Sequence, residues 1–113
     1  MNNIEVLNTK LTELQEQVLC ELEKTSNAQF ICKKLNIKPI TLSKSLSALT
    51  NKNLYADNEL TDQGKKMVHY IFFRNNTITN FLNLHKITIN DEISRQMKSL
   101  DMKIIIALKN ALV

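Results

Sequence analysis

Hydroxyl and ammonium side chains recur at short intervals between residues 38 and 47. Lys38 and Lys44 carry positive charge, and Thr41, Ser43 and Ser47 carry small hydroxyl groups. Side chains of these types suit the edges of bases and the phosphates of DNA. We therefore predict a DNA-contacting surface centred on this segment. Its candidate residues are Asn27, Gln29, Lys38, Pro39, Ile40, Thr41, Ser43, Lys44, Ser47, Lys52 and Asn58.

The sequence around this segment contains several lysines and no acidic residue. No Asp or Glu occurs from residue 24 to residue 52, a stretch that holds Lys24, Lys33, Lys34, Lys38, Lys44 and Lys52. The segment before it concentrates acid instead, at Glu13, Glu16, Glu21 and Glu23. The net charge of +4 is small, but a local positive field favours phosphate binding through counterion release. The alternative is that these lysines only keep a surface hydrated.

Two short helices joined by a tight turn are expected to present these side chains. Apolar residues recur at helical spacing, break at residues 36 and 37, and resume; they are Ala28, Ile31, Cys32 and Leu35, then Leu42, Leu46 and Leu49. Asn27 has a side chain that can cap the first helix, and Pro39 suits the first turn of the second, at about 38–50. Asn36 tolerates the left-handed conformation that ends a helix. This pattern, from residue 27 to residue 54, is typical of a helix-turn-helix DNA reader.

The flanking segments predict a supporting helix and a short hairpin. The supporting helix begins at Thr9 or Thr12 and runs to about Lys24, with the glutamates opposite its apolar stripe. That stripe consists of Leu11, Leu14, Val18 and Leu22. After the second reading-unit helix, residues 54–56 and 59–61 flank an Asp-Asn turn, which indicates a minimal hairpin or wing. Because the wing is so short, we expect it to contact phosphate at most.

Two further helical segments carry more apolar surface than a small winged-helix core covers. One begins at Thr61, and we allow for a break in it near Asn75 and Asn76; the other begins at Asn90. Contiguous exposed apolar surface usually marks an interface, so residues 67–113 are predicted to form a dimerisation arm. Its predicted contact residues are Ile71, Ile78, Phe81, Ile93, Met97, Leu100, Ile104 and Leu108. The alternative is that these helices cover each other and the supporting helix.

The chain as a whole predicts a mainly α fold with a small β-hairpin. Its 113 residues suffice for a winged helix-turn-helix domain at 1–66 and the helical arm at 67–113, but not for a large enzyme. No apolar run approaches the length of a membrane span. The N-terminal residues MNNIEVLNTK lack the pattern of a secretory signal, so a cytoplasmic location is expected.

The residue types that carry catalysis or bind metals are sparse. Gly64 is the single glycine, which argues against a glycine-rich phosphate loop, and no set of Ser, His, Cys and Asp suggests an activated nucleophile. Cys20 and Cys32 lack metal-site spacing, and redox sensing by either is a minor alternative to packing. His69 and His85 lie without carboxylates at ligand spacing. We expect neither an enzyme nor a cofactor.

The segments LTELQEQVLCEL, NAQFICKKLNIKPITLSKSLSALTNKNL and LTDQGKK occur in an order that resembles winged-helix bacterial regulators of the MarR type, over about residues 11–66. This resemblance implies that the helix beginning at Lys38 and Pro39 enters the major groove. It also implies that the terminal helices pair two subunits on a palindromic site.

A second resemblance is to metal-dependent repressors of the diphtheria-toxin-repressor type, through LTDQGKKMVHYIFFRNNTITNFL. The metal ligands of that family have no counterpart here. Arg74 is followed by two asparagines rather than by His, and residues 96–101 contain neither Glu nor His. We therefore expect no metal site of that type.

The sequence predicts a bacterial transcriptional regulator, a homodimeric repressor that reads an inverted repeat in double-stranded DNA. An apolar junction near Phe72, Phe73 and Phe81 would permit a small-molecule effector. The alternative is a winged-helix protein-interaction module or accessory subunit that does not read DNA sequence. It is motivated by the weak overall charge, the short wing and the lack of Arg on the proposed reading helix.

Overall fold

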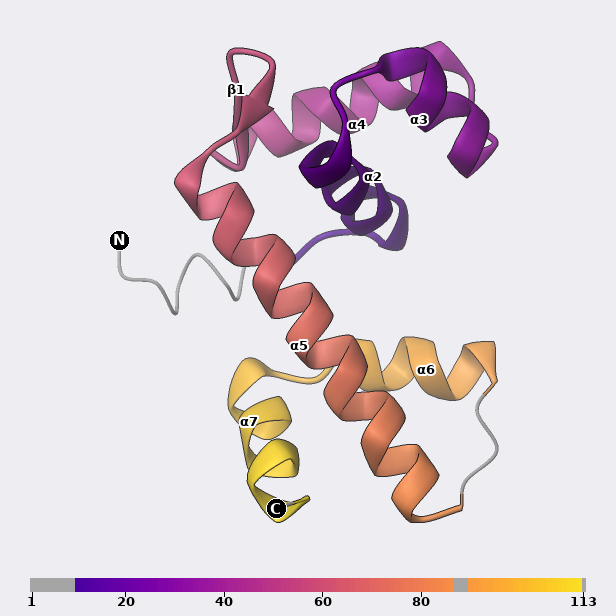
Figure 1. Ribbon diagram of the computed structural model, residues 1–113, viewed down its shortest axis with the longest axis vertical. Helices are drawn as coiled ribbons and strands as arrows, with labels where there is room; N and C mark the ends of the chain where they lie inside the picture. The colour runs from indigo at the N-terminus through magenta and orange to yellow at the C-terminus, as the bar shows by residue number, and fades with distance from the viewer. Residues whose placement is uncertain (1–9, 87–89, 113) are drawn as a thin grey trace. The chain divides into compact units, whose positions relative to one another are not determined.

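The computed structural model describes residues 10–86 and 90–112. These residues form six helices and one two-stranded antiparallel sheet (Figure 1). The elements are α2 (Glu13–Lys24), α3 (Ala28–Leu35), α4 (Pro39–Asn51), β1 (Tyr55–Ala56), β2 (Glu59–Leu60), α5 (Asp62–Leu84), α6 (Asp91–Lys98) and α7 (Met102–Ala111). The prediction of a mainly helical fold with a small hairpin is confirmed.

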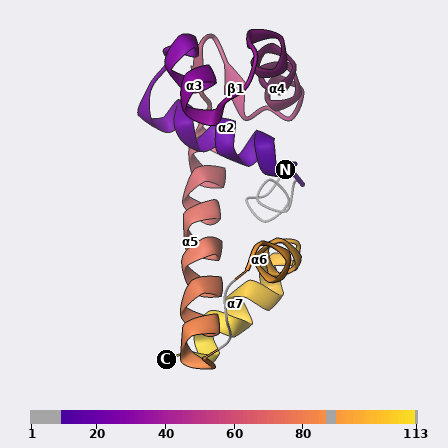
Figure 2. The same cartoon turned by 90° about the vertical axis from the view of Figure 1, so that its right-hand side faces the viewer.

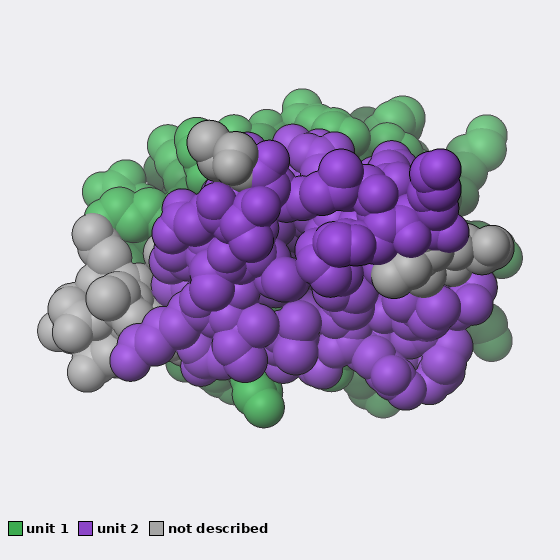
Figure 3. Space-filling model, turned by 90° about the horizontal axis from the view of Figure 1, so that it is seen from below, with its two compact units in different colours: residues 1–69 green, residues 70–113 purple. Residues whose placement is uncertain are grey.

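The chain divides into two compact units, coloured separately in Figure 3. Unit 1 is Met1–His69 and unit 2 is Tyr70–Val113. The boundary falls inside α5, three residues after the division expected between residues 66 and 67. One continuous helix therefore supplies core residues to both units.

Helix α2 begins with a reciprocal cap at Thr12. The Thr12 side chain accepts a hydrogen bond from the Gln15 backbone N–H, and the Gln15 side chain accepts one from the Thr12 N–H, both at 3.1 Å. Thr12 is therefore the N-cap of α2 and is one of the two start positions predicted for this helix. The other, Thr9, lies outside the described residues.

The buried face of α2 differs from the predicted stripe. Val18 and the unpredicted Leu19 are fully buried, whereas the other three predicted residues, Leu11, Leu14 and Leu22, are half-buried. Because α2 packs against both α3 and α4, neighbouring positions 18 and 19 face apolar surroundings together. A prediction that assumes one apolar face per helix misses a residue such as Leu19, which is buried because a second helix also packs against α2.

The core of unit 1 combines α2, α3, α4, the hairpin and the start of α5. Its buried apolar side chains are Val18, Leu19, Ile31, Leu42, Leu49, Leu54, Leu60, Met67 and Val68. Of the four apolar positions predicted for α3, Ala28 is exposed, which corrects the prediction, and Cys32 and Leu35 are half-buried. Ala28 is the first residue of α3, so its side chain lies beyond the edge of this core.

The hairpin pairs Tyr55 with Leu60 and Ala56 with Glu59, which leaves a two-residue turn. The turn residues, Asp57 and Asn58, both have positive φ, of 53° and 65°. Turns with two left-handed residues match the twist of hairpin strands, and Asp and Asn tolerate that conformation. The predicted Asp-Asn turn is confirmed.

Helix α5 begins against the loop that follows α4. The Thr61 hydroxyl accepts from the Gly64 N–H at 3.0 Å and donates to the Asn53 carbonyl at 2.7 Å. A Cβ on Gly64 would collide with the carbonyl oxygen of Leu54, so the close approach requires glycine here.

Helix α5 continues unbroken for 23 residues, so the break considered near Asn75 and Asn76 does not occur. Asparagine weakens a helix by well under about 1 kcal/mol per residue, too little to end one that is packed. The Asn75 side chain instead accepts hydrogen bonds from the Arg74 guanidinium, at 2.8 and 3.2 Å.

Unit 2 consists of the later part of α5 with α6 and α7, which lie beside it in Figures 1 and 2. Asn90 caps α6 by accepting from the Ile93 N–H at 2.9 Å, as predicted. The terminal segment is two helices rather than one, because Asp101 caps α7 at the Lys103 N–H. Ile78, Leu82 and Ile105 form the buried cluster of this unit.

Candidate nucleic-acid interface

The turn that joins α3 to α4 has the three features predicted from sequence: a cap, a left-handed residue and a proline in the first turn. The Asn27 side chain accepts from the Phe30 N–H at 3.1 Å and caps α3. Asn36 ends α3 in the left-handed conformation, with φ 55° and ψ 51°. Pro39 is the first residue of α4, where its missing N–H costs no helical hydrogen bond. The orientation of α4 on α3 is thus set by backbone geometry that the local sequence specifies.

Helix α4 buries one face and exposes the other. Leu42, Ser45 and Leu49 are buried. On the opposite side Ile40, Ser43, Lys44 and Ser47 are exposed, and they recur at intervals of three and four residues. Lys38 and Pro39 are also exposed, whereas Thr41 is half-buried at the edge of the face. We call Ile40, Ser43, Lys44 and Ser47 the α4 row.

The remaining predicted DNA contacts occupy different surroundings. Asn27 and Gln29 are exposed at the start of α3, and Asn58 is exposed at the hairpin turn. Lys52 is half-buried, and its ammonium donates to the Lys10 carbonyl at 2.6 Å and to Gln15 Oε1 at 3.5 Å. The Lys52 charge therefore ties the end of α4 to the segment that leads into α2.

Some of the lysines between residues 24 and 52 contact other groups of unit 1. Lys24 and Lys34 both contact Glu21 Oε1, with nitrogen–oxygen distances of 3.3 and 3.0 Å. Together with Lys52, half of the lysines between residues 24 and 52 are engaged inside unit 1. Lys24 and Lys34 nevertheless stay exposed, as do Lys33, Lys38 and Lys44, so Lys52 alone of these six lysines is half-buried.

Glu21 is the charged residue that sequence reasoning placed wrongly. It was expected on the solvated face of α2, but only 5% of its surface is exposed. Its Oε2 is buried without a hydrogen-bond partner in the part of the chain that the structure describes. The neighbouring Glu23 and Lys24 gave no local signal for burial, because the decisive partner, Lys34, belongs to the next helix.

The ion pair shifts both pKa values. Burial alone would raise the pKa of Glu21, but the hydrogen bonds from Lys34 and Lys24 and their charges outweigh it and lower the pKa below its usual 4.5. The hydrogen bond to Glu21 is the main cause that raises the pKa of Lys34 above 10.5. Both residues are therefore held in their charged forms at neutral pH.

The predicted dimerisation residues are mostly covered within one chain. Ile71 and Ile78 are buried, and a further five, Phe81, Ile93, Met97, Leu100 and Leu108, pack half-buried against the unit 2 cluster. Only Ile104 of the predicted set is a large exposed side chain, at 47%. The premise that a monomer leaves this face open was wrong, because α6 and α7 return to cover the later part of α5. The alternative that the two segments cover each other is the observed arrangement in unit 2.

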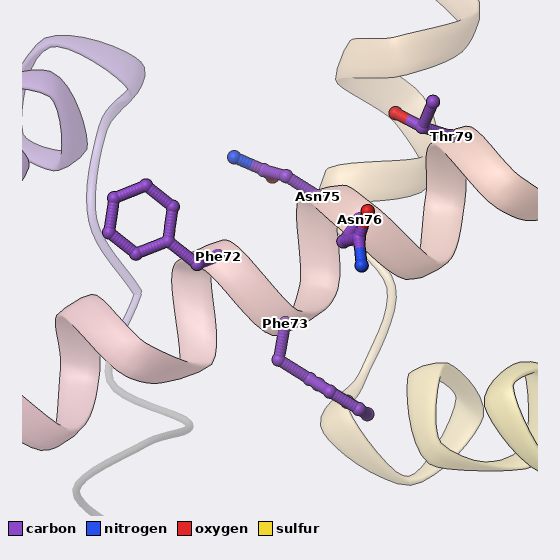
Figure 4. A pocket seen from close by; sticks show the side chains of 5 residues that line it. All are labelled: Phe72, Phe73, Asn75, Asn76 and Thr79. Carbon is purple, nitrogen blue, oxygen red and sulfur yellow. The ribbon is translucent and has the colours of Figure 1, made fainter.

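A surface depression on α5 is lined in part by two exposed aromatic residues. Its volume is about 530 Å³, and Phe72, Phe73, Asn75, Asn76 and Thr79 line it. Figure 4 shows the two phenylalanine side chains leaving the helix in different directions.

Phe81, the third aromatic residue expected at an effector site, does not line this depression. Its ring lies 4.5 Å from that of His85, centroid to centroid, and it packs against the unit 2 cluster. The three phenylalanines therefore do not form one pocket.

The other reactive residues are separated. Cys20 and Cys32 are both half-buried thiols, on α2 and α3. Within residues 10–86 and 90–112, no three residues among His, Cys, Asp and Glu come together to hold a metal ion. In the same ranges no helix has the length and apolar character that crossing a membrane requires.

Comparison of the chain with protein-family models, with curated proteins and with solved structures gives no match.

Proposed function

We propose that this chain is a sequence-specific DNA-binding transcriptional regulator of the winged helix-turn-helix class, acting as a homodimeric repressor. In this proposal α3 and α4 are the helix-turn-helix, β1 and β2 are a short wing, and α4 is the reading helix. The observation that carries the proposal is the α4 row, an uninterrupted exposed face of hydroxyl, ammonium and apolar groups on a helix whose opposite face is buried.

The chemistry of that face suits a major groove. The Ser43 and Ser47 hydroxyls can donate to or accept from base edges, and Lys44 can reach a guanine edge or a phosphate. Lys38 at the start of α4 and Lys33 on α3 are exposed lysines on the same helix pair. Because Lys24, Lys34 and Lys52 are engaged elsewhere, we assign the phosphate contacts to Lys33, Lys38 and Lys44.

Pairing of two copies would place two reading helices on the half-sites of an inverted repeat, about 34 Å apart. The large apolar groups of unit 2 that are still available for such pairing are exposed side chains of α5 and α7, namely Phe72, Phe73, Leu84, Ile104 and Ile106. This set shares only Ile104 with the residues predicted from sequence. The resemblance to MarR-type regulators is consistent with pairing through terminal helices.

Fluorescence anisotropy with duplex DNA at several salt concentrations tests the proposal. We expect binding that weakens steeply with salt, because lysines displace counterions from phosphate. Lys44→Ala should weaken binding and, if Lys44 meets phosphate, reduce the salt slope by about one. Lys103→Ala, which removes an exposed lysine from α7, is the matched control and should leave the affinity unchanged. Absent or salt-independent binding would refute the proposal.

A protein-interaction module is the second candidate, and one observation favours it. Phe30 on α3 is 51% exposed. Contact with water contributes little favourable free energy for an aromatic side chain, and a phosphate-binding surface gives it no apolar partner. In that case the helix pair would bind an apolar groove of a partner protein. The candidate predicts no salt-dependent DNA binding and a stoichiometric protein complex that Phe30→Ser disrupts.

A further inference from the structure

Ile40 has the largest exposed fraction of any large apolar side chain among the described residues, at 65%. It is the second residue of α4, immediately after Pro39. From this helix the unit 1 core takes Leu42 and Leu49, which lie on the opposite side, and Ile40 is not part of it. An isoleucine so exposed gains little free energy from folding.

The neighbours of Ile40 on the helix surface are polar. Ser43 and Lys44 lie three and four residues further along, where side chains of a helix meet, and both are exposed. Ile40 is therefore the apolar member of the α4 row. One apolar group beside hydroxyl and ammonium groups suits a binding partner whose surface is polar and carries one apolar group opposite Ile40.

The major groove of DNA is such a surface. Each base pair presents hydrogen-bonding groups there, and the C5-methyl of thymine is the apolar group by which A·T pairs differ. In helix-turn-helix proteins the first residues of the reading helix contact base edges. Isoleucine is branched at Cβ and restricted at χ1, so fixing it against a methyl group costs little side-chain freedom.

Resting on the proposed DNA-binding function, we propose that Ile40 selects thymine by packing against its methyl group. The preferred site then carries a thymine at the same position of each half-site, next to the base or phosphate that Lys44 contacts. Ile40 is a specificity-determining residue, whereas the lysines supply affinity that is independent of sequence.

Deletion of the methyl group tests this directly. Duplexes bound by the full chain are recovered from a random pool, and each thymine of the enriched site is replaced singly by deoxyuridine, which pairs alike but lacks the methyl. Loss of one buried methyl group is worth ~0.8 kcal/mol, or about fourfold in affinity. We expect one thymine per half-site to show this loss with the unaltered protein.

The Ile40→Ala variant completes a double-mutant cycle. It should bind the thymine duplex more weakly and be insensitive to uracil at that one position. Gln63→Ala, which truncates an exposed side chain of α5 outside the proposed DNA-contact and pairing sets, is the control and should keep the uracil effect. Circular dichroism verifies that each variant is folded, and exposure of both side chains makes this the expected result.

The outcomes separate this inference from the function on which it rests. If a site is enriched but no thymine is sensitive to uracil, or if Ile40→Ala keeps the sensitivity, the role of Ile40 is refuted and DNA binding stands. If no duplex is bound by the unaltered protein, both fail together.

Discussion

Lys34 on α3 contacts the buried carboxylate of Glu21 on α2, with 3.0 Å between Nζ and Oε1. This ion pair joins the helix that supports unit 1 to the helix that precedes the proposed reading helix. Removing one member of such a pair costs more than the pair contributes, since the other charge stays buried. The geometry of α3 therefore depends on a contact between residues 13 positions apart in sequence.

Replacement of Lys34 by Met should destabilise the fold, because Glu21 then keeps only the longer contact with Lys24, at 3.3 Å. We expect the midpoint of thermal unfolding to fall by roughly 5 °C. Lys33→Met changes the same charge at the neighbouring, exposed position and is the control. Differential scanning calorimetry of both variants measures the difference, and equal midpoints would show that the ion pair does not stabilise α3.

The same carboxylate predicts a pH dependence. The pKa of Glu21 is lower in the folded than in the unfolded chain, so its contribution to stability is present above its usual value of 4.5 and is lost as the pH falls through the folded pKa. Between about pH 6 and about pH 3 the unaltered protein should lose more stability than Glu21→Gln. Denaturant unfolding at each pH provides the measurement; parallel curves would contradict the prediction.

Local and long-range features differed in how far they could be predicted. The caps at Asn27 and Asn90, the left-handed Asn36 and the Asp57–Asn58 turn follow from single residues and their immediate neighbours, and all were identified from sequence. The burial of Glu21 was not, because it depends on a helix that follows in the chain. The cap at Asp101, which divides the terminal segment into α6 and α7, was a local signal that helical periodicity concealed.

In the proposed interface, too, local features could be predicted from sequence and long-range contacts could not. The exposed face of α4 followed from its apolar periodicity, whereas the engagement of Lys52 with the Lys10 carbonyl required the path of the chain before α2. The covering of Ile78 by α7 likewise depends on tertiary packing, so apolar content alone overstated the need for a partner subunit.

Gly64 offers a test of the contact between α5 and the loop after α4. Alanine normally stabilises a helix relative to glycine, but here its Cβ would meet the Leu54 carbonyl oxygen. We therefore expect Gly64→Ala to lower the free energy of unfolding by more than about 1 kcal/mol. Gln63→Ala, at the exposed neighbouring position, should be nearly neutral. Urea unfolding of both variants decides, and a more stable Gly64→Ala would contradict the packing.

Adjacent isoleucines in α7 test the core of unit 2. Ile105 is fully buried, whereas Ile106 is 43% exposed. Ile105→Ala should cost about 2–5 kcal/mol by leaving a cavity beside Ile78 and Leu82, and Ile106→Ala no more than roughly 0.5 kcal/mol. Denaturant unfolding followed by circular dichroism measures both. Similar losses for the two variants would mean that α7 does not pack as described.

Selection of bound duplexes from a random pool tests the central claim, that α4 reads DNA sequence, most directly. We predict enrichment of an inverted repeat with half-sites about one helical turn apart. A variant in which Ser43, Lys44 and Ser47 are all replaced by Ala should lose this enrichment while keeping its fold. Recovery of random sequence by the unaltered protein, or the same enriched site with the triple variant, would contradict recognition through α4.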